Sequence, residues 1–589
     1  MKNERSLKIT RRAFVQCAAV ALGSLITAAC NAQNTDDDAP TAVVPPPMPT
    51  GAPPRPVPVV IPPAPPAPFP AQMIFVNALA ANANDANPGT ESRPLKTIAK
   101  AADLALANNL RDIGTQVVIY PGVYRESVSL QPKTWHANVP IQFRARENGT
   151  AIIAGSDVWT GWKRQGSMNV YTHNWPYKWG VAPIPSGWKG HVDLKPIVRR
   201  REMVFINGAS LTQVLSNRDM KEGTFYVSEQ SATISLMPPA GVEVESATIE
   251  VAIRSGLFTV AGGQNLTVRG LVFMHDNTPV DGTAVTFIDC TNVTVEDCKF
   301  LWNNWAGTTF LTSPPQSSRG MIARRNIANY NGAIGMAASY VKDVLYEDNE
   351  TSYNNWRGAL GGFNSWATAG MKHFAVHGGT YRRHRAVGNH AAGCWFDTDC
   401  TNIAIEQAFC SRNDGTGLFI EASEGPTSIT DCTVCHCQTD AGILSEGATN
   451  VVLQGNIIYG NASAQIRVLK GIRPVKNWET AENLNLTAEQ WTLRKNIIIG
   501  TDAAPRLVDL TNSEGANGSR FLSTLVSDEN VWFSPKNGKV FDVNGKSIDF
   551  TTWQSVSKQD GGSRFIDPQF VNAEDDDFTL PPGNPLPSK

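Results

Sequence analysis

A short phrase that ends in an acid occurs three times between residues 393 and 446. It reads GCWFD at 393–397, GLFIE at 417–421 and GILSE at 442–446. Its glycines are 417 − 393 = 24 and 442 − 417 = 25 residues apart, and its acids are Asp397, Glu421 and Glu446. Two carboxyl groups about 5 to 5.5 Å apart can hydrolyse a glycosidic bond with retention of configuration, one as the nucleophile and the other as acid and base.

Alternation assigns the two faces of the repeated phrase. Successive side chains of a β-strand point to opposite faces, so Cys394 and Phe396 share one face, and Trp395 and Asp397 share the other. A repeat of 24 to 25 residues predicts a β-solenoid in which equivalent positions stack at about 4.8 Å. We expect the small or aliphatic face to fill the solenoid and the acids to form a column on its outer wall.

The acid column has more than one explanation. For catalysis, the like charges should raise the pKa of one member, which a proton donor at neutral pH needs. Stacked carboxylates can also bind Ca²⁺, and a stripe of exposed acids can be only a solvated face. The spacing alone leaves these alternatives open.

Recurring turn phrases predict the scaffold that positions this column. They place Asn or Cys at one position of successive turns, with steps of 326 − 298 = 28, 349 − 326 = 23 and 456 − 432 = 24 residues. Stacked small polar residues can satisfy turn amides along a solenoid. The phrases are DCKF at 297–300, RNIA at 325–328, DNET at 348–351, DCTV at 431–434, GNII at 455–458 and KNII at 495–498.

Before the repeat, the sequence predicts a strand at 74–77, a turn at 87–89, a helix at 94–105 and the first strands at 117–126. This order resembles the N-terminal cap of right-handed parallel β-helix proteins of the pectate-lyase-like superfamily. An amphipathic helix is expected at 94–105, where it would cover the open end of the solenoid. We therefore predict an all-β, right-handed parallel β-helix with an N-terminal helical cap and an inserted small β domain. The predicted segments are a signal at 1–30, a Pro-rich linker at 31–72, the cap and first coils at 73–155, the inserted domain at 156–250, and the β-helix with its closing segment at 251–589.

Composition and the N-terminus limit the function classes. The formal net charge of the 589 residues is −2, which argues against a broad basic surface for nucleic acid. TRRAFV at 10–15 resembles a twin-arginine export signal, and LITAAC at 25–30 resembles a lipoprotein cleavage box with lipidation at Cys30. We expect an exported protein in the periplasm or at the cell surface that meets the membrane only through a lipid anchor.

Cysteines do not suggest a metal centre. Three of the ten, at 432, 435 and 437, surround His436, but their spacing matches no paired-cysteine zinc pattern. We expect these small residues to stack inside the turns, and one or two disulfides stay open in an exported protein.

The phrases around Asp397 and Glu421 resemble the paired motifs of β-helical glycoside hydrolases, the β-xylosidases of family 120 and the related family 141. The matching stretches are GCWFDTD at 393–399 and GLFIEASEGP at 417–426. In those families the acid of a W-[LF]-D phrase is the nucleophile, and the glutamate of an E-x-x-x-G-P phrase is the acid/base. The resemblance implies that Asp397 is the nucleophile and Glu421 the proton donor. The sequence departs from the xylosidase motif at Glu424, where the motif has His, and this position bears on the leaving sugar.

Residues near the two acids complete a predicted substrate groove. Some belong to the repeated phrases, and others lie one to two turns earlier in a segment rich in aromatic and basic residues. Arg and Lys there would suit an acidic sugar, or they could simply support loops. The predicted substrate-binding residues are Trp356, Arg357, Trp366, Lys372, His384, Trp395, Asp399, Glu424 and Glu446.

Two other functions fit the same scaffold. A polysaccharide lyase commonly uses Lys or Arg as the base and Ca²⁺ to neutralise a uronate, so Lys372, Arg382 or Arg385 would be the base. The two candidate catalytic acids and Asp399 would then hold the metal. A non-catalytic carbohydrate-binding surface protein is the third class. We favour a retaining glycoside hydrolase of a plant or microbial polysaccharide or oligosaccharide that needs no cofactor.

Overall fold

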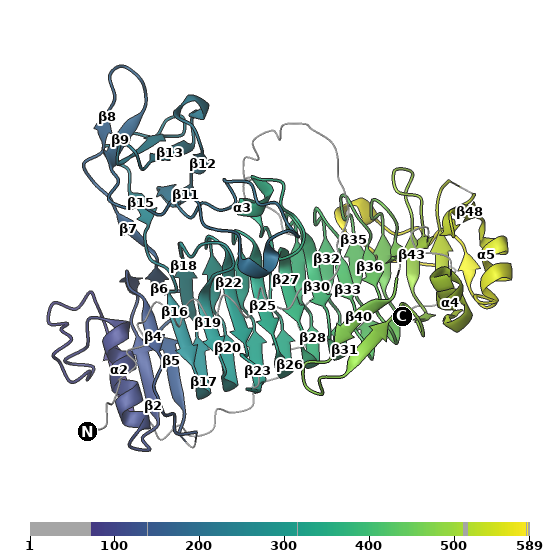
Figure 1. The fold of residues 1–589 in the computed structure, drawn as a ribbon, viewed down its shortest axis with the longest axis horizontal. Helices are drawn as coiled ribbons and strands as arrows, with labels where there is room; N and C mark the ends of the chain where they lie inside the picture. The colour runs from purple at the N-terminus through teal and green to yellow at the C-terminus, as the bar shows by residue number, and fades with distance from the viewer. Residues whose placement is uncertain are drawn as a thin grey trace, which may run out of the picture.

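The described chain forms a right-handed parallel β-helix, which confirms the predicted fold class (Figure 1). The computed structural model describes residues 72–586, apart from 138, 315, 470, 511–515, 537 and 585. The predicted signal, Cys30 and the Pro-rich linker up to residue 71 lie outside the described residues. Among the described helices, none is both long and apolar enough to cross a membrane.

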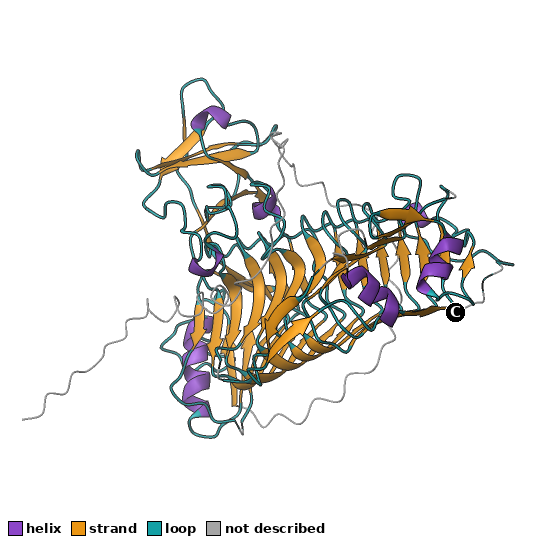
Figure 2. Cartoon of the chain, turned by 45° about the vertical axis from the view of Figure 1, so that its right-hand side comes forward, coloured by secondary structure: helices purple, strands orange, loops and turns teal. Residues whose placement is uncertain are grey.

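Three sheets form the walls of the solenoid (Figure 2). In the described chain the first wall has 13 strands, all in parallel pairs. They are β1 (Gln72–Val76), β2 (Thr115–Ile119), β5 (Ile141–Ala145), β17 (Gln264–Arg269), β20 (Thr291–Glu296), β23 (Ser318–Arg324), β26 (Val341–Glu347), β28 (His377–Arg382), β31 (Thr401–Glu406), β34 (Thr427–Thr430), β37 (Val451–Gln454), β42 (Thr492–Arg494) and β45 (Val526–Asp528).

The second wall carries the acid column. Its strands pair in parallel until the last, β48, which runs antiparallel to β47. They are β4 (Val128–Leu130), β16 (Phe258–Ala261), β19 (Thr283–Ile288), β22 (Ala306–Leu311), β25 (Ile334–Ser339), β27 (Ala369–Phe374), β30 (Ala392–Asp397), β33 (Leu418–Glu421), β36 (Ile443–Glu446), β39 (Ile466–Leu469), β44 (Val508–Leu510), β47 (Phe541–Val543) and β48 (Lys546–Ile548).

The third wall is divided into two runs of strands. The first run is β3 (Gly122–Tyr124), β6 (Ala151–Ala154), β18 (Leu271–Met274), β21 (Lys299–Leu301) and β24 (Ile327–Asn329). The second is β29 (Arg385–Val387), β32 (Phe409–Ser411), β35 (Thr433–Cys435), β38 (Ile457–Tyr459), β43 (Ile497–Ile499), β46 (Val531–Phe533) and β49 (Arg564–Phe565).

A small β insert rises from the N-terminal half of the solenoid (Figure 1). It has two sheets and an apolar core of its own, which includes Trp175 and Phe225. Its strands are β7 (Ser156–Val158), β8 (Lys163–Arg164), β9 (Tyr171–Asn174), β10 (Val204–Ile206), β11 (Ala209–Ser210), β12 (Thr212–Val214), β13 (Thr224–Ser228), β14 (Thr233–Met237) and β15 (Ile249–Ala252).

Helices and one hairpin complete the described elements. The helices are α2 (Ile98–Asn109), α3 (Trp356–Ala359), α4 (Ala516–Thr524) and α5 (Phe550–Ser557), with 3-10 turns η1 (Ser186–Trp188), η2 (Asn217–Asp219) and η3 (Ala573–Asp575). The hairpin pairs β40 (Arg473–Lys476) with β41 (Asn483–Leu486).

Helix α2 covers the N-terminal end of the solenoid (Figure 1). Thr97 caps it by accepting from the backbone N–H of Lys100, and the Glu126 carboxylate accepts from the first two helical N–H groups. A carboxylate suits this end because the helix dipole is positive there. The buried stripe that includes Ile98 and Ala102 then closes the apolar core.

The asparagine ladder predicted from the turn phrases runs between the first and third walls. The side-chain amides of Asn326 and Asn456 each donate to the asparagine of the next coil, at 3.0 and 2.9 Å. Cys298 and Cys432 occupy equivalent positions and donate through their backbone N–H groups to Asn326 and Asn456. All eight cysteines of the described chain are buried and free, so they pack in and beside the turns without disulfides.

A second ladder runs between the third and second walls through Asn331, Asn354, Asn389 and Asn413. Asn354 Nδ2 donates to Asn389 Oδ1 at 3.0 Å and to the carbonyl of Ala328 at 2.9 Å. Its Oδ1 accepts from the backbone and side-chain nitrogens of Asn331. A primary amide has two donor hydrogens and two acceptor sites, so the ladder uses all of them in a buried position.

The glycine that opens the repeated phrase lies against this second ladder. A Cβ atom at Gly393 would lie 2.7 Å from the carbonyl oxygen of Gly417 and 2.8 Å from Asn413 Nδ2. At Gly370 it would meet the equivalent atoms of the next coil. Because the coils pack this closely, only glycine fits at the start of the phrase.

We expect Asn389→Leu to lower the free energy of unfolding by about 2 to 5 kcal/mol, because it leaves buried groups of two neighbouring coils without partners, at about 1 to 3 kcal/mol each. Chemical denaturation followed by circular dichroism measures this change. Gln454→Ala removes an exposed amide of β37 and should change stability by less than about 0.5 kcal/mol. Equal stability of the two variants would contradict the role of the ladder.

Candidate active site

The acid column lies on the outer side of the second wall. Strands β30 and β33 are in register up to Phe396 and Ile420, so the residues that follow, Asp397 and Glu421, lie side by side. Glu421 is paired directly with Glu446 of β36. Adjacent strands are about 4.8 Å apart, so the three acids occupy consecutive coils.

Alternation separates the core of the solenoid from the site. Phe396 lies in the main apolar core, and Trp395 packs outside it on Phe419, with ring centroids 5.0 Å apart. Asp397 and Glu421 face the same outer side, yet only 5% and 4% of their surfaces are exposed. The acids therefore point outward, as expected, but other parts of the chain cover them.

Asp397 pairs with a lysine of the preceding coil. Lys372 Nζ lies 2.8 Å from Asp397 Oδ2, and it also donates to the carbonyl of Trp366. The same ammonium lies over the ring of Trp395, 3.2 Å from its centroid. Thr398 Oγ1 donates to Asp397 Oδ1 at 2.8 Å. These contacts orient the Asp397 side chain and provide a counter-charge in a buried place.

Glu421 receives a hydrogen-bond donor on each carboxyl oxygen. Trp395 Nε1 donates to Oε2 at 3.0 Å, and Arg473 Nη2 donates to Oε1 at 2.8 Å. These donors favour the carboxylate, but burial and the nearby charge of Asp397 favour the acid more strongly. The net effect raises the pKa of Glu421 to about 8. Glu421 is therefore mainly protonated at neutral pH and can lose its proton without a large cost.

The β40–β41 hairpin supplies Arg473 to the column. Its guanidinium joins two acids, since Nη1 lies 2.6 Å from Glu446 Oε1 while Nη2 contacts Glu421. Only 7% of the Arg473 surface is exposed. The hairpin thus places a positive charge between two acids that would repel each other whenever both are ionised.

The tip of the hairpin is fixed beside the acids. Asp399 Oδ2 accepts from the backbone N–H of Trp478 at 2.8 Å. His377 lies between this carboxylate, at 3.3 Å, and the carboxylate of Glu479, at 2.6 Å. Lys342 pairs with Glu479 as well. Side chains of the first wall and of the turn between β30 and β31 therefore hold the hairpin over the pocket.

Solenoid, hairpin and insert enclose a pocket of about 790 Å³ above the acids. Trp478 lines it from the hairpin, His191 from the insert, and Trp366 from the loop after α3. The rings of His191 and Trp366 are stacked, with centroids 5.5 Å apart. This volume falls in the range of about 300 to 1,000 Å³ that is usual for sites of small ligands.

Most of the predicted site residues come together at this pocket. Lys372 does not line the pocket, but it contacts Asp397 from a position beside the pocket. The predicted residues that line the pocket are Asp397, Glu421, Trp366, Trp395, Asp399 and Glu446.

Arg357 was predicted to bind substrate, but it lies between the solenoid and the insert. Its guanidinium is fully buried and donates to the carbonyl of Glu202, to Gln213 Oε1 and to Asn304 Oδ1. A cation buried in this way satisfies its donors at the junction of the two parts, and it does not line the pocket above the acids.

Three other predicted substrate-binding residues also lie away from the pocket. His384 is inside the solenoid, where Nε2 is 2.9 Å from Thr351 Oγ1 and burial lowers the pKa of the ring to about 4. Trp356 borders a separate groove of about 230 Å³ beside the insert. Glu424 is exposed and does not line the pocket. These residues are near the acids in sequence but face other sides of the coil.

Sequence reasoning missed the hairpin and its contacts. A signal was present, because the step between equivalent turn positions is 496 − 456 = 40 residues there and 456 − 432 = 24 one coil earlier. The additional residues include β40 and β41. The missed residues are Arg473, Trp478, Tyr340 and His377.

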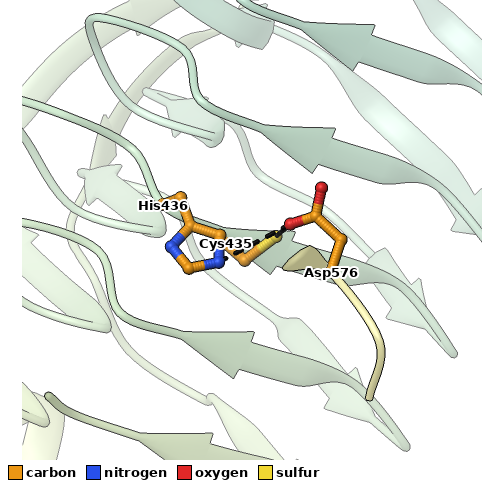
Figure 3. A group of neighbouring side chains, drawn as sticks. All are labelled: Cys435, His436 and Asp576. Carbon is orange, nitrogen blue, oxygen red and sulfur yellow. Dashed lines mark hydrogen bonds and ion pairs between the residues drawn. The ribbon is translucent and has the colours of Figure 1, made fainter. Parts of the chain in front are cut away.

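A second cluster of reactive side chains lies on the third wall. One potential ligand atom each of Cys435, His436 and Asp576 lies within 4.8 Å of the others (Figure 3). His436 Nε2 is 3.0 Å from the carbonyl of Ala573, and Arg412 pairs with Asp576. Burial raises the pKa of the Cys435 thiol. A guanidinium at the carboxylate and a protonated thiol disfavour a metal ion here. We interpret the cluster as a set of contacts that attaches the C-terminal segment around Asp576 to the third wall.

Comparison with known sequences does not assign the chain to a family. No protein-family model matches the sequence. A stretch of 77 residues is 35% identical to the uncharacterized protein YwoF of Bacillus subtilis (strain 168). That match spans 13% of this chain and 15% of that protein.

Comparison with solved structures is more informative. A complex of XylC with xylose matches with a TM-score of 0.64 and 16% identity, over 85% of this chain and 87% of that one. The chain is a parallel β-helix protein. A structure described as a glycoside hydrolase matches this β-helix with a TM-score of 0.48 and 10% identity, over 74% of this chain and 94% of that one. The A-module of the mannuronan C-5 epimerase AlgE4 of Azotobacter vinelandii gives 0.44 and 12%, over 80% and 96%. At these identities the likeness concerns the fold.

We expect Glu421→Gln to stabilise the β-helix progressively as the pH rises. The pKa of Glu421 is raised from about 4.5 to about 8, so between these values the folded state keeps a proton that the unfolded state has lost. Stability of the wild type therefore falls across this window. At pH 8 the variant should be more stable by roughly 2 to 4 kcal/mol, measured by denaturation at several pH values.

The control for this experiment is Glu482→Gln, which changes an exposed acid of the hairpin loop. Its stability should follow the pH dependence of the wild type. If the curves of Glu421→Gln and wild type run parallel from pH 5 to 8, Glu421 does not titrate as described.

Proposed function

We propose that this chain is an exported, lipid-anchored glycoside hydrolase that cleaves a plant or microbial saccharide with retention, through Asp397 and Glu421. One observation carries the catalytic part: two acids lie side by side on adjacent coils, in an enclosed pocket, with different surroundings. Asp397 has an ammonium partner, and Glu421 has a pKa raised to about 8. Unlike environments for paired carboxyls suit a nucleophile and a proton donor. Export and anchoring rest on the sequence motifs at 10–15 and 25–30.

The reaction would take two steps. An oxygen of the Asp397 carboxylate attacks the anomeric carbon as the bond to the leaving oxygen breaks, and Glu421 gives that oxygen its proton. A glycosyl ester on Asp397 results. Glu421, now a carboxylate, then takes a proton from water, whose oxygen attacks the anomeric carbon and releases the Asp397 carboxylate. Inversion at each step gives overall retention.

Neighbouring side chains would support these steps. Lys372 and Thr398 hold the two oxygens of Asp397, so the attacking atom is positioned before substrate binds. Trp366 and Trp478 offer aromatic surfaces to a sugar ring on two sides of the pocket.

The contacts of the basic residues do not favour the lyase alternative. Arg382 pairs with two glutamates on the first wall, and Arg385 lies over the ring of Phe409 on the third. Lys372 is paired with Asp397. Because Lys372 and Arg473 already provide counter-charges for the two acids, a Ca²⁺ ion at the same oxygens would meet repulsion.

The charge of the pocket favours an uncharged glycan over an acidic one. Lys372 and Arg473, which could have bound a uronate, are paired with acids of the site. A uronate carboxylate would therefore enter a field of like charge. The carboxyl groups that line the pocket are Asp193, Asp397, Asp399, Glu421 and Glu446, against the cations Arg473 and Lys476.

We expect Asp397→Asn and Glu421→Gln each to lower kcat by about 10³-fold or more on a natural glycan, with unchanged circular dichroism. With an aryl glycoside whose leaving group needs no proton, Glu421→Gln should keep a fast first step, but Asp397→Asn should not. Release of the phenol, followed by stopped flow, measures this step. Glu482→Gln is the control with wild-type turnover, and near-normal kcat in either acid variant would remove that residue from the mechanism.

We expect neutral oligosaccharides to be hydrolysed and uronate-containing ones to be poor substrates, by at least about tenfold in kcat/KM. A panel of neutral and acidic glycans with reducing-end detection tests this. Products that absorb in the ultraviolet through a new double bond, together with loss of activity on chelation, would instead establish the lyase.

A further inference from the structure

Four charged groups face the Glu421 carboxyl, and one of them comes from a different part of the chain than the other three. Asp397, Lys372 and Glu446 come from strands of the second wall, where coil-to-coil pairing fixes them. Arg473 comes from the hairpin, yet it makes the direct contact, with Nη2 at 2.8 Å from Glu421 Oε1. Of these four charged groups, the one that bonds Glu421 is therefore the one that the hairpin carries and the wall does not.

The balance of these charges changes during the proposed reaction, on which this inference rests. Before the first step, the Asp397 carboxylate favours a proton on Glu421. Once Asp397 is esterified, that charge is gone, and Lys372 and Arg473 face Glu421 against Glu446 alone. With two cations and one anion around it, Glu421 favours its ionised form over its protonated form. The second step needs this carboxylate as its base.

We infer that Arg473 is a positioning residue that holds Glu421 as a carboxylate between the two steps, and that the β40–β41 hairpin keeps it there. The proton that Glu421 gives to the leaving oxygen is not taken back from solvent, because Arg473 Nη2 already bonds the oxygen of the resulting anion. Water then supplies the proton that Glu421 removes.

The tip of the hairpin is held by ionic contacts of Glu479 in addition to the hydrogen bond to Asp399. In the described chain, Trp478 Nε1 and Asp399 Oδ1 are buried without a hydrogen-bond partner. Glu479 carries the contacts to His377 and Lys342. Loss of the Glu479 charge should therefore loosen the tip and affect Glu421 from a distance, through Arg473.

Kinetics of Arg473→Met and Arg473→Lys in the full chain test the inference, with a natural glycan that the wild type cleaves for the pH profile and an aryl glycoside of the same sugar for the burst. The alkaline limb of kcat/KM should lie near pH 8 in the wild type, where Glu421 titrates. It should move up by about 1 to 3 pH units in the methionine variant, and by less in the lysine variant. Slow release of the glycosyl ester should also give a burst of phenol before the steady state in the methionine variant.

Two hairpin variants separate this role from a merely structural one. Glu479→Gln should move the alkaline limb in the same direction as Arg473→Met but less far. Glu482→Gln, an equal change of charge at an exposed site of the same hairpin, should leave it in place. An unmoved limb without a burst in Arg473→Met overturns the inference.

A direct titration keeps the inference testable if no glycan is cleaved. Infrared difference spectra of the protonated carboxyl, assigned by its loss in Glu421→Gln, give the titration midpoint of Glu421 without substrate. A higher midpoint in Arg473→Met supports the role of Arg473 even if the proposed hydrolase activity fails. An unchanged midpoint overturns it even if hydrolysis is observed.

Discussion

The position of the catalytic candidates depends on one constraint, the equal register of successive coils. A slip of one residue would turn Asp397 and Glu421 into the core and bring Phe396 and Ile420 to the surface. The asparagine ladders oppose such a slip, because each amide bonds to the equivalent amide of the next coil. Polar groups inside the turns thus determine the chemistry that the outer wall can present.

Close placement of acids has a cost that the rest of the site offsets. Asp397 and Glu421 are almost fully buried and Glu446 is partly buried, so their carboxylates would repel one another strongly. Lys372 and Arg473 separate the charges, one from a neighbouring coil and the other from the hairpin. The raised pKa of Glu421 reports the repulsion and burial that these cations do not remove.

The features of the fold that could be predicted from the sequence are those that repeat along the chain. The acid column, the inward face of each phrase and the first ladder all recur at intervals of 23 to 28 residues, so stacking could be inferred from spacing. The hairpin occurs once and carries no periodic signal except a lengthened step. Arg473 contacts Glu421 across 52 residues of chain, a contact that no local pattern encodes.

Closeness in sequence was also a poor guide within a single coil. A coil has three walls, and only the second carries the acid column. His384 lies in the turn between the first and third walls and packs inward, whereas Arg357 lies in α3 against the insert. Both precede Asp397 by fewer than two coils, yet neither faces the pocket. A residue's wall, more than its distance along the chain, decides what it contacts.

The reversed direction of β48 has a consequence beyond the site. A parallel stack that ended on an unpaired strand would offer its free N–H and C=O groups to another molecule, as the tip of a growing fibril does. Here the last strand of the second wall turns back on β47, and Trp553 of α5 packs into the core at the same end (Figure 1). With α2 at the other end, the stack is bordered on both sides by elements that do not repeat, so a molecule that continued the parallel pairing of the second wall would not meet a matching coil there.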